Sequence, residues 1–131
     1  MATDHFGFTK LVVGDLEKCA SFYKSVCELT EHARVDASID GRPISEIIFN
    51  PTQGATAFVL LTFVGAAAPQ ADEVILGFIT PSVDAFVARA RAAGGSVVQE
   101  AVNQPEHGVR VAFVRDVEGH LIEVVETLPP A

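Results

Sequence analysis

Residues 112–123 read AFVRDVEGHLIE: two apolar runs joined by the polar segment Asp116–Gly119. The runs belong to segments 109–114 and 121–126, which are rich in β-branched and apolar residues and are therefore predicted strands. Aspartate and glycine between such runs favour a turn. The sequence thus predicts a strand–turn–strand hairpin close to its C-terminal end.

The same half of the chain begins with a predicted strand over residues 73–79 and a predicted helix. Ser82 is a suitable N-cap for that helix, and Gly94-Gly95 a suitable C-terminal stop. A third strand is predicted over 96–100, before the hairpin. The apolar residues recur on one face of the predicted helix, at Val83, Phe86, Val87 and Ala90.

The first half of the chain has the same order of elements. A strand over 6–13 is followed by Asp15, an N-cap residue, and by a helix over 16–27 with apolar residues at helical spacing. Three further strands are predicted, separated by the turn dipeptides Asp40-Gly41 and Asn50-Pro51. They lie around residues 32–37, 44–49 and 56–63.

The repeated order predicts an α+β fold made of two βαβββ modules. Module 1 is expected over about 4–64, a linker over about 65–72 and module 2 over about 73–128, all within one domain of 131 residues. Each antiparallel-rich sheet would have one face for its helix and another to wrap a cavity.

Composition excludes several classes of function. The net charge of −8 disfavours nucleic acid and anionic membrane surfaces as partners. The longest weakly polar stretch, 56–69, is too short for a membrane span, and no signal peptide is expected because charged residues interrupt the N-terminal region. Cys19 and Cys27 are expected as buried thiols in one helix, which fits a cytoplasmic protein.

Two segments resemble the vicinal-oxygen-chelate superfamily, which contains glyoxalases, bleomycin-resistance proteins and extradiol dioxygenases. One begins at residues 11–17, LVVGDLE, and extends to Phe22-Tyr23; the other is the hairpin segment 112–123. The resemblance implies a cup-shaped mixed sheet around a cavity. The chain departs from the family pattern at Glu28, where glycine is usual, and at Val117, where proline is usual.

Metal-dependent members of that superfamily take four ligands from the first and last strands of the modules. Carried over one by one, those positions fall on Phe8, Leu60, Ile75 and Glu123. Three are apolar and cannot bind metal, and one carboxylate does not hold a divalent ion alone. No cofactor is therefore expected, and a divalent metal held in an unconventional site is the alternative. His5, three residues before Phe8, is a weak candidate ligand that strand alternation points away from the cavity.

Strand alternation and the family positions together predict an apolar pocket with two charged groups. Glu123 could act as a general base on an enolisable carbonyl compound, and Lys10 could stabilise the oxyanion formed. The alternative is that Lys10 and Glu123 have no catalytic role. They would then form an ion pair without a function, or Lys10 would extend its ammonium to the edge of the cavity. The predicted substrate-binding residues are Phe8, Val12, Phe58, Leu60, Thr62, Ile75, Gly77, Ile79 and Leu121, with His107 in a loop near the cavity mouth.

Two classes of function follow from the resemblance. The first is a glyoxalase-like lyase or isomerase that acts on a small carbonyl or aromatic molecule without the usual metal. The second is a metal-free protein of the bleomycin-resistance type that binds and sequesters a small molecule, although the chain has no tryptophan to stack on a flat ligand. A homodimer is expected in either case, because module edges would otherwise be unpaired.

Overall fold

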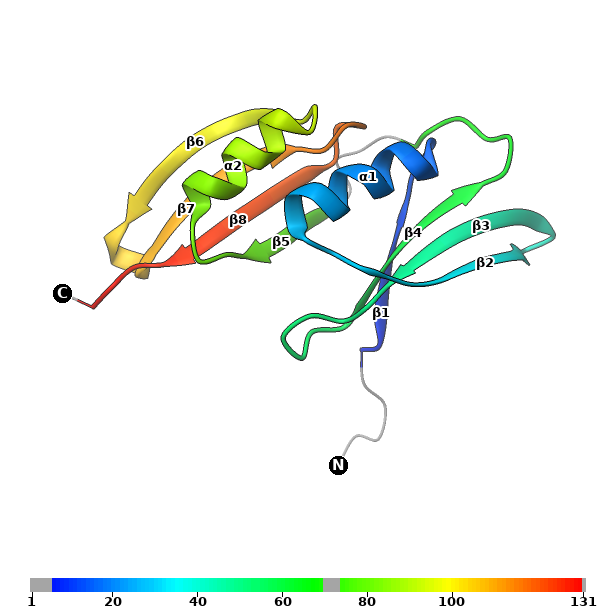
Figure 1. Ribbon diagram of the computed structural model, residues 1–131, viewed down its shortest axis with the longest axis horizontal. Helices are drawn as coiled ribbons and strands as arrows, with labels where there is room; N and C mark the ends of the chain where they lie inside the picture. Colours follow the sequence, from blue (N-terminus) through cyan, green and yellow to red (C-terminus); the bar gives the residue numbers. More distant parts are fainter. Residues whose placement is uncertain (1–5, 70–73, 131) are drawn as a thin grey trace. The chain divides into compact units, whose positions relative to one another are not determined.

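The computed structural model describes residues 6–69 and 74–130. The chain divides into two compact units, one made of residues up to 24 with 28–69, the other of 25–27 with 70 onward. Each unit contains a four-stranded mixed sheet (Figure 1). Among the described residues, no helix is long and apolar enough to cross a membrane.

The first unit has the strand order β1-β4-β3-β2. β1 lies parallel to β4, and the other neighbours are antiparallel. This is the predicted strand–helix–three-strand order. Its elements are β1 Phe8–Val12, α1 Leu16–Cys27, β2 Glu31–Ile39, β3 Arg42–Phe49 and β4 Ala57–Phe63.

The second unit repeats this arrangement with the order β5-β8-β7-β6, again with its first strand parallel to its last. The predicted hairpin is confirmed, since β7 and β8 pair antiparallel. α2 packs on β6, β7 and β8 (Figure 1). The elements are β5 Ile75–Ile79, α2 Val83–Ala92, β6 Ser96–Gln104, the short 3-10 helix η1 Pro105–His107, β7 Val109–Arg115 and β8 Leu121–Thr127. The α+β fold of two βαβββ modules is therefore confirmed.

Both helices begin where their caps predict. The Asp15 carboxylate accepts from the backbone N–H of Lys18 at 3.0 Å, and the Ser82 hydroxyl accepts from that of Ala85 at 3.2 Å. These bonds satisfy backbone donors that have no partner inside the helix. α1 ends at Cys27, and the C-cap residue Glu28 adopts the left-handed conformation with φ of 57°.

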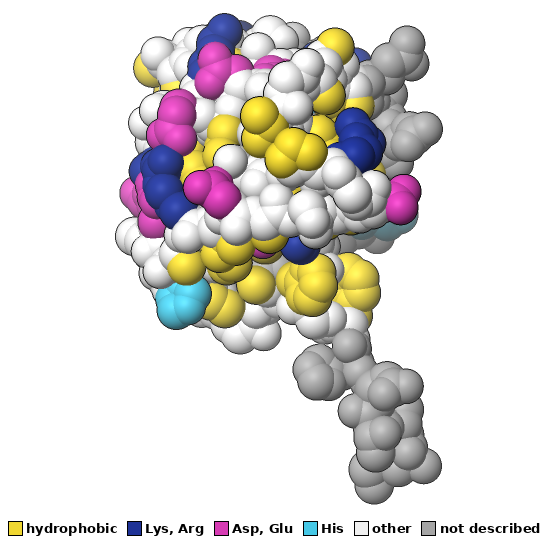
Figure 2. Space-filling model, turned by 90° about the vertical axis from the view of Figure 1, so that its right-hand side faces the viewer, with side chains coloured by type: hydrophobic (Ala, Val, Ile, Leu, Met, Phe, Trp, Pro, Cys, Tyr) yellow, Lys and Arg dark blue, Asp and Glu magenta, His cyan; other side chains and the backbone are white. Residues whose placement is uncertain are grey.

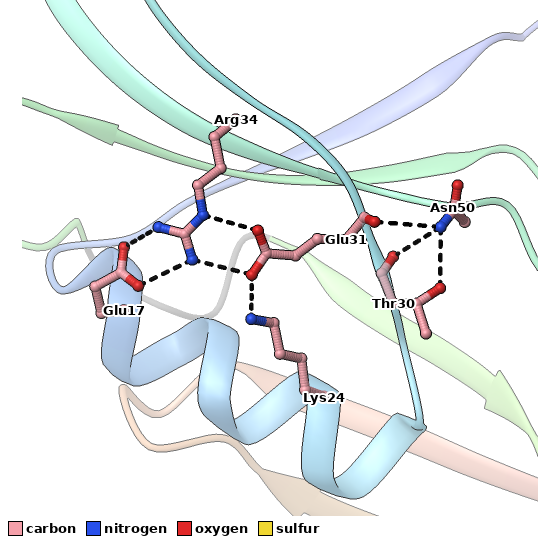
Figure 3. A network of polar contacts seen from close by, with 6 residues as sticks. All are labelled: Glu17, Lys24, Thr30, Glu31, Arg34 and Asn50. Carbon is pink, nitrogen blue, oxygen red and sulfur yellow. Dashed lines mark hydrogen bonds and ion pairs between the residues drawn. The ribbon is translucent and has the colours of Figure 1, made fainter.

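A polar network joins α1 to β2 in the first unit (Figure 3). The Arg34 guanidinium donates to both carboxylate oxygens of Glu17, at 2.6 and 3.0 Å, and to the Glu31 carboxylate at 2.7 Å. Lys24 also donates to Glu31, while the Asn50 amide donates to the Thr30 hydroxyl. The network ties the helix to the sheet at their solvent-facing sides.

Candidate functional site

The face of each sheet opposite its helix is the candidate site. In the first unit, the register pairs Lys10 with Val59 and Val12 with Leu61. Paired residues of neighbouring strands point to the same side of a sheet. Glu46, which pairs with Leu61, therefore lies on the Lys10 side as well. We call this side the opposite face of the first sheet; Phe8, half-buried Val12 and Phe63 also belong to it.

The predicted orientation of β4 is wrong. Phe58, Leu60 and Thr62 pair with residues of the α1 side, as Thr9 pairs with Phe58 and Leu11 with Leu60. The Phe58 ring lies 5.2 Å from that of Tyr23 in α1. The Thr62 hydroxyl donates to the Gly14 carbonyl, and Leu60 is fully buried. These three residues contribute to the helix-side packing of the first unit and do not lie on the Lys10 face.

Lys10 forms an ion pair that the sequence analysis missed. Its ammonium lies 2.9 Å from a carboxylate oxygen of Glu46 and 5.6 Å from the centre of the Phe8 ring. The Glu46 side chain is 9% exposed and that of Lys10 32%. A buried carboxylate requires such a partner. The available signal was a single acidic residue inside the apolar strand segment ISEIIF, residues 44–49.

Glu123 lies at the middle of the opposite face of the second sheet. It pairs with Gly77 of β5 on one side and with Phe113 of β7 on the other. Its side chain is half-buried. Among residues 6–69 and 74–130, no hydrogen bond or ion pair involves its carboxylate. The face therefore presents one carboxylate between an aromatic ring and a residue without a side chain.

The predicted neighbours of Glu123 on β5 and β8 share its face. Ile75 pairs with Leu121 and Ile79 with Val125, so these four residues surround the Gly77–Glu123 pair. Ile75 is 56% exposed and Ile79 86% exposed. Exposed isoleucines next to a carboxylate form a surface suited to a mainly apolar ligand with one polar group. In the first unit, hydrophobic side chains also reach the surface among charged ones, over the side where β2 and β3 lie (Figure 2).

His107 lies apart from this group. It is exposed in η1, and the next residue, Gly108, accepts a hydrogen bond at its carbonyl from the backbone N–H of Leu128, beyond the end of β8. Glu123 pairs with Phe113, four residues beyond the start of β7. The register therefore does not bring His107 beside Glu123. His5 lies outside the described residues.

A divalent metal does not fit the residues at the family's ligand positions. Phe8 and Ile75 are exposed apolar side chains, and Leu60 lies on the helix side. Val59 and Leu61, the residues of β4 that do lie on the opposite face of the first sheet, are apolar too, so the corrected orientation of β4 supplies no donor. The strand neighbours of Glu123 also lack donor side chains. In the described ranges, no three His, Cys, Asp or Glu side chains lie close enough to bind one ion.

The thiols offer no reactive nucleophile. Cys19 is fully buried. Burial raises the pKa of the Cys27 thiol far above its ordinary range, so the thiolate, which is the reactive form, is scarce at neutral pH. The buried histidine of the hairpin turn, His120, has a structural contact instead: its Nδ1 lies 2.8 Å from a carboxylate oxygen of Asp116.

The architecture is that of a two-module α+β protein with one repeated βαβββ unit. The family model of the Glyoxalase/Bleomycin resistance protein/Dioxygenase superfamily matches residues 3–124, and the chain belongs to this superfamily. This confirms the resemblance drawn from residues 11–23 and 112–123. No curated protein matches the chain.

Solved structures share the fold. A glyoxalase family protein from Bacillus cereus superposes with a TM-score of 0.80 at 22% identity, over 98% of this chain and 99% of that one. A hypothetical protein from S. aureus gives a TM-score of 0.67 at 27% identity, over 95% and 97%. A glyoxalase I mutant from Zea mays gives a TM-score of 0.70 at 17% identity, over 92% of this chain and 45% of that longer one.

Proposed function

We propose that the protein is a glyoxalase-like enzyme, a lyase or isomerase, which acts on a small carbonyl or aromatic molecule without a resident metal. The observation that carries the proposal is the Glu123 carboxylate, half-buried among apolar side chains and without a partner among the described residues. A carboxylate in such a place is suited to accept a proton from a bound ligand. The apolar residues at the other ligand positions support catalysis by side chains alone.

The reaction needs only proton transfers. Glu123 removes a proton from the carbon next to a carbonyl, and the electron pair of that C–H bond moves to the carbonyl oxygen. The enolate oxygen requires a cation or a hydrogen-bond donor to stabilise it. The role of Lys10, whose ammonium lies 2.9 Å from Glu46 in the first unit, stays a prediction from the sequence. With an α-hydroxy ketone, return of the proton from Glu123 to the former carbonyl carbon, while the α-hydroxyl proton passes to the enolate oxygen, completes an isomerisation. Return to the original carbon regenerates the substrate and exchanges its α-proton with solvent. No oxidant or reductant is required.

Deuterium exchange tests this function. Purified protein is incubated in D₂O with a panel of small α-hydroxy ketones and aryl ketones, and loss of the α-proton signal is followed by NMR. We expect faster exchange for at least one compound, and a loss of roughly a hundredfold or more in Glu123→Gln, the range of a general base. Glu100→Gln is the matched control, because its carboxylate is exposed on β6 and pairs with Arg91. Equal rates in Glu123→Gln and the control would refute the proposal.

A small-molecule binding function is the second candidate. Exposed Ile75 and Ile79 beside an unpartnered carboxylate also suit an apolar ligand that carries a cationic group, and the net charge of −8 favours a cation. This alternative predicts binding of a ligand without deuterium exchange.

We further propose a homodimer as the working form, since β5 and β6 are edge strands of the second sheet and edge strands favour pairing between copies. Light scattering during size-exclusion chromatography tests it.

A further inference from the structure

Gly77 occupies the middle of β5, where glycine is costly. A glycine within a strand loses more conformational freedom on folding than other residues and contributes no side chain to packing. The neighbouring positions of the same strand carry isoleucine, leucine and phenylalanine. A structural reason for glycine is therefore expected at this position.

The usual structural reasons do not apply to Gly77. The pairing of β5 with β8 runs without a register shift from Ile75 to Ile79, so the glycine marks no bulge. Its φ lies outside the left-handed region that favours glycine. A Cβ added to Gly77 would meet no atom of the described residues within 4 Å, apart from its chain neighbours. Close packing inside the protein does not require the glycine either.

The space above Gly77 adjoins the candidate base. Gly77 and Glu123 are register partners, so the Glu123 side chain rises from the same face directly beside that space. Ile75 and Ile79, two residues away on either side, extend from the same face of β5. The space is thus bordered by one carboxylate and two exposed aliphatic side chains.

We propose that the space above Gly77 is where the ligand lies, and that Gly77 determines specificity by leaving room for it. The ligand is a small molecule with an apolar body and with an N–H, O–H or acidic C–H group directed at Glu123. A packed protein surface is a poorer occupant, because it would remove the carboxylate from water without a donor, at a large cost. This inference builds on the proposed function by giving the place of the substrate beside the base.

Substitution of Gly77 tests the proposal. The protein and its Gly77→Ala and Gly77→Val variants are titrated with the ketone panel and with benzylamine, a cationic aromatic probe, and backbone amide shifts are followed by NMR. We expect shifts at Gly77, Phe113 and Glu123 in the natural protein. Affinity should fall severalfold in Gly77→Ala and at least tenfold in Gly77→Val. Thermal stability should be equal or higher in Gly77→Ala, since the added Cβ meets open space, and in Gly77→Val, since a β-branched residue also suits a strand.

Gly7→Ala and Gly7→Val are the matched controls. An added Cβ at Gly7 also meets open space, and its φ lies outside the left-handed region as well. These variants should bind as the natural protein does. Unchanged affinity in Gly77→Val, or no shift at Gly77 with any probe, would overturn the proposal. A change of oligomeric state in Gly77→Val with unchanged probe binding would also overturn it and would point to a second copy on this face.

The two proposals fail in different ways. Probe binding that Gly77→Val abolishes, without deuterium exchange in the natural protein, would retain the ligand position and refute the enzymatic function. Deuterium exchange that depends on Glu123 but is equal in Gly77→Val would retain the enzymatic function and refute the ligand position.

Discussion

The ammonium of Lys10 lies 2.9 Å from the Glu46 carboxylate, on the face of the first sheet that is turned away from α1. The two partners differ in their access to water, because the Glu46 side chain is 9% exposed and the Lys10 side chain 32%. Removal of Lys10 and removal of Glu46 should therefore lower the free energy of unfolding by different amounts. The lysine can extend its ammonium into solvent when the pair is broken, whereas the glutamate cannot.

Removal of Lys10 should destabilise the protein more than removal of Glu46. In Lys10→Met the buried carboxylate is left unpaired, and we expect a loss of about 2–3 kcal/mol in the free energy of unfolding. In Glu46→Leu the loss should be about 1 kcal/mol, because Lys10 stays solvated. The double variant should lie close to the natural protein. Urea unfolding of the four proteins gives the coupling energy, and equal losses in the two single variants would contradict the asymmetry.

Phe58 and Phe8 should differ sharply in their contribution to stability. The Phe58 ring contacts Tyr23 at 5.2 Å and stacks on Phe49 at 6.0 Å, so Phe58→Ala should cost about 3 kcal/mol. Phe8 is 58% exposed, and Phe8→Ala should cost less than about 1 kcal/mol. Urea unfolding measures both. Similar losses would contradict the assignment of Phe58 to the α1 side.

The same comparison shows what the sequence could predict. In the second unit, Glu123, Gly77 and Ile75 lie on one face, as strand alternation and the family positions predict. In the first unit, β4 reads AFVLLTF and is apolar on both faces, so alternation carries no information about orientation. Only the pairing register with β1 shows which residues of β4 lie on which face of the sheet.

Contacts between residues far apart in the sequence account for the other differences between the predicted and the observed structure. β6 extends to Gln104, beyond the predicted end at residue 100, because its pairing with β7 continues through two register shifts. Its exposed polar residues give no strand pattern that a local rule can detect. The Lys10–Glu46 contact joins residues 36 positions apart, across β4, and no local spacing predicts it. The helices, set by local caps and apolar spacing, were predicted with correct N-terminal ends.

The network around Glu31 should make stability depend on pH in acid (Figure 3). Hydrogen bonds from Arg34 and Lys24 lower the pKa of Glu31 from its ordinary value of 4.5 to about 2. As the pH falls through this window, the unfolded state takes up the proton first, so the contribution is present above pH 4.5 and is lost as the pH falls towards 2. Glu31→Gln should therefore lose less stability than the natural protein between these pH values.

Urea unfolding at several pH values between 5 and 3 measures this difference. The effect should shrink at about 1 M salt, where the screening length is about 3 Å, because the network is solvent-facing. Parallel pH profiles for Glu31→Gln and the natural protein at low salt would show that the network contributes nothing to acid stability.

Glu28→Gly should stabilise the protein. Glu28 ends α1 with φ of 57° and ψ of 31°, a left-handed conformation that costs an L-residue with a Cβ about 1 kcal/mol and costs glycine little. The hydrogen bond from its backbone N–H to the Tyr23 carbonyl does not involve the side chain and should persist. We expect the free energy of unfolding to rise by up to about 1 kcal/mol, in urea or thermal unfolding. Lys18→Gly, inside the same helix, is the control and should lower it by about 1 kcal/mol. A loss in both variants would show that the Glu28 side chain stabilises the helix end by more than its backbone conformation costs.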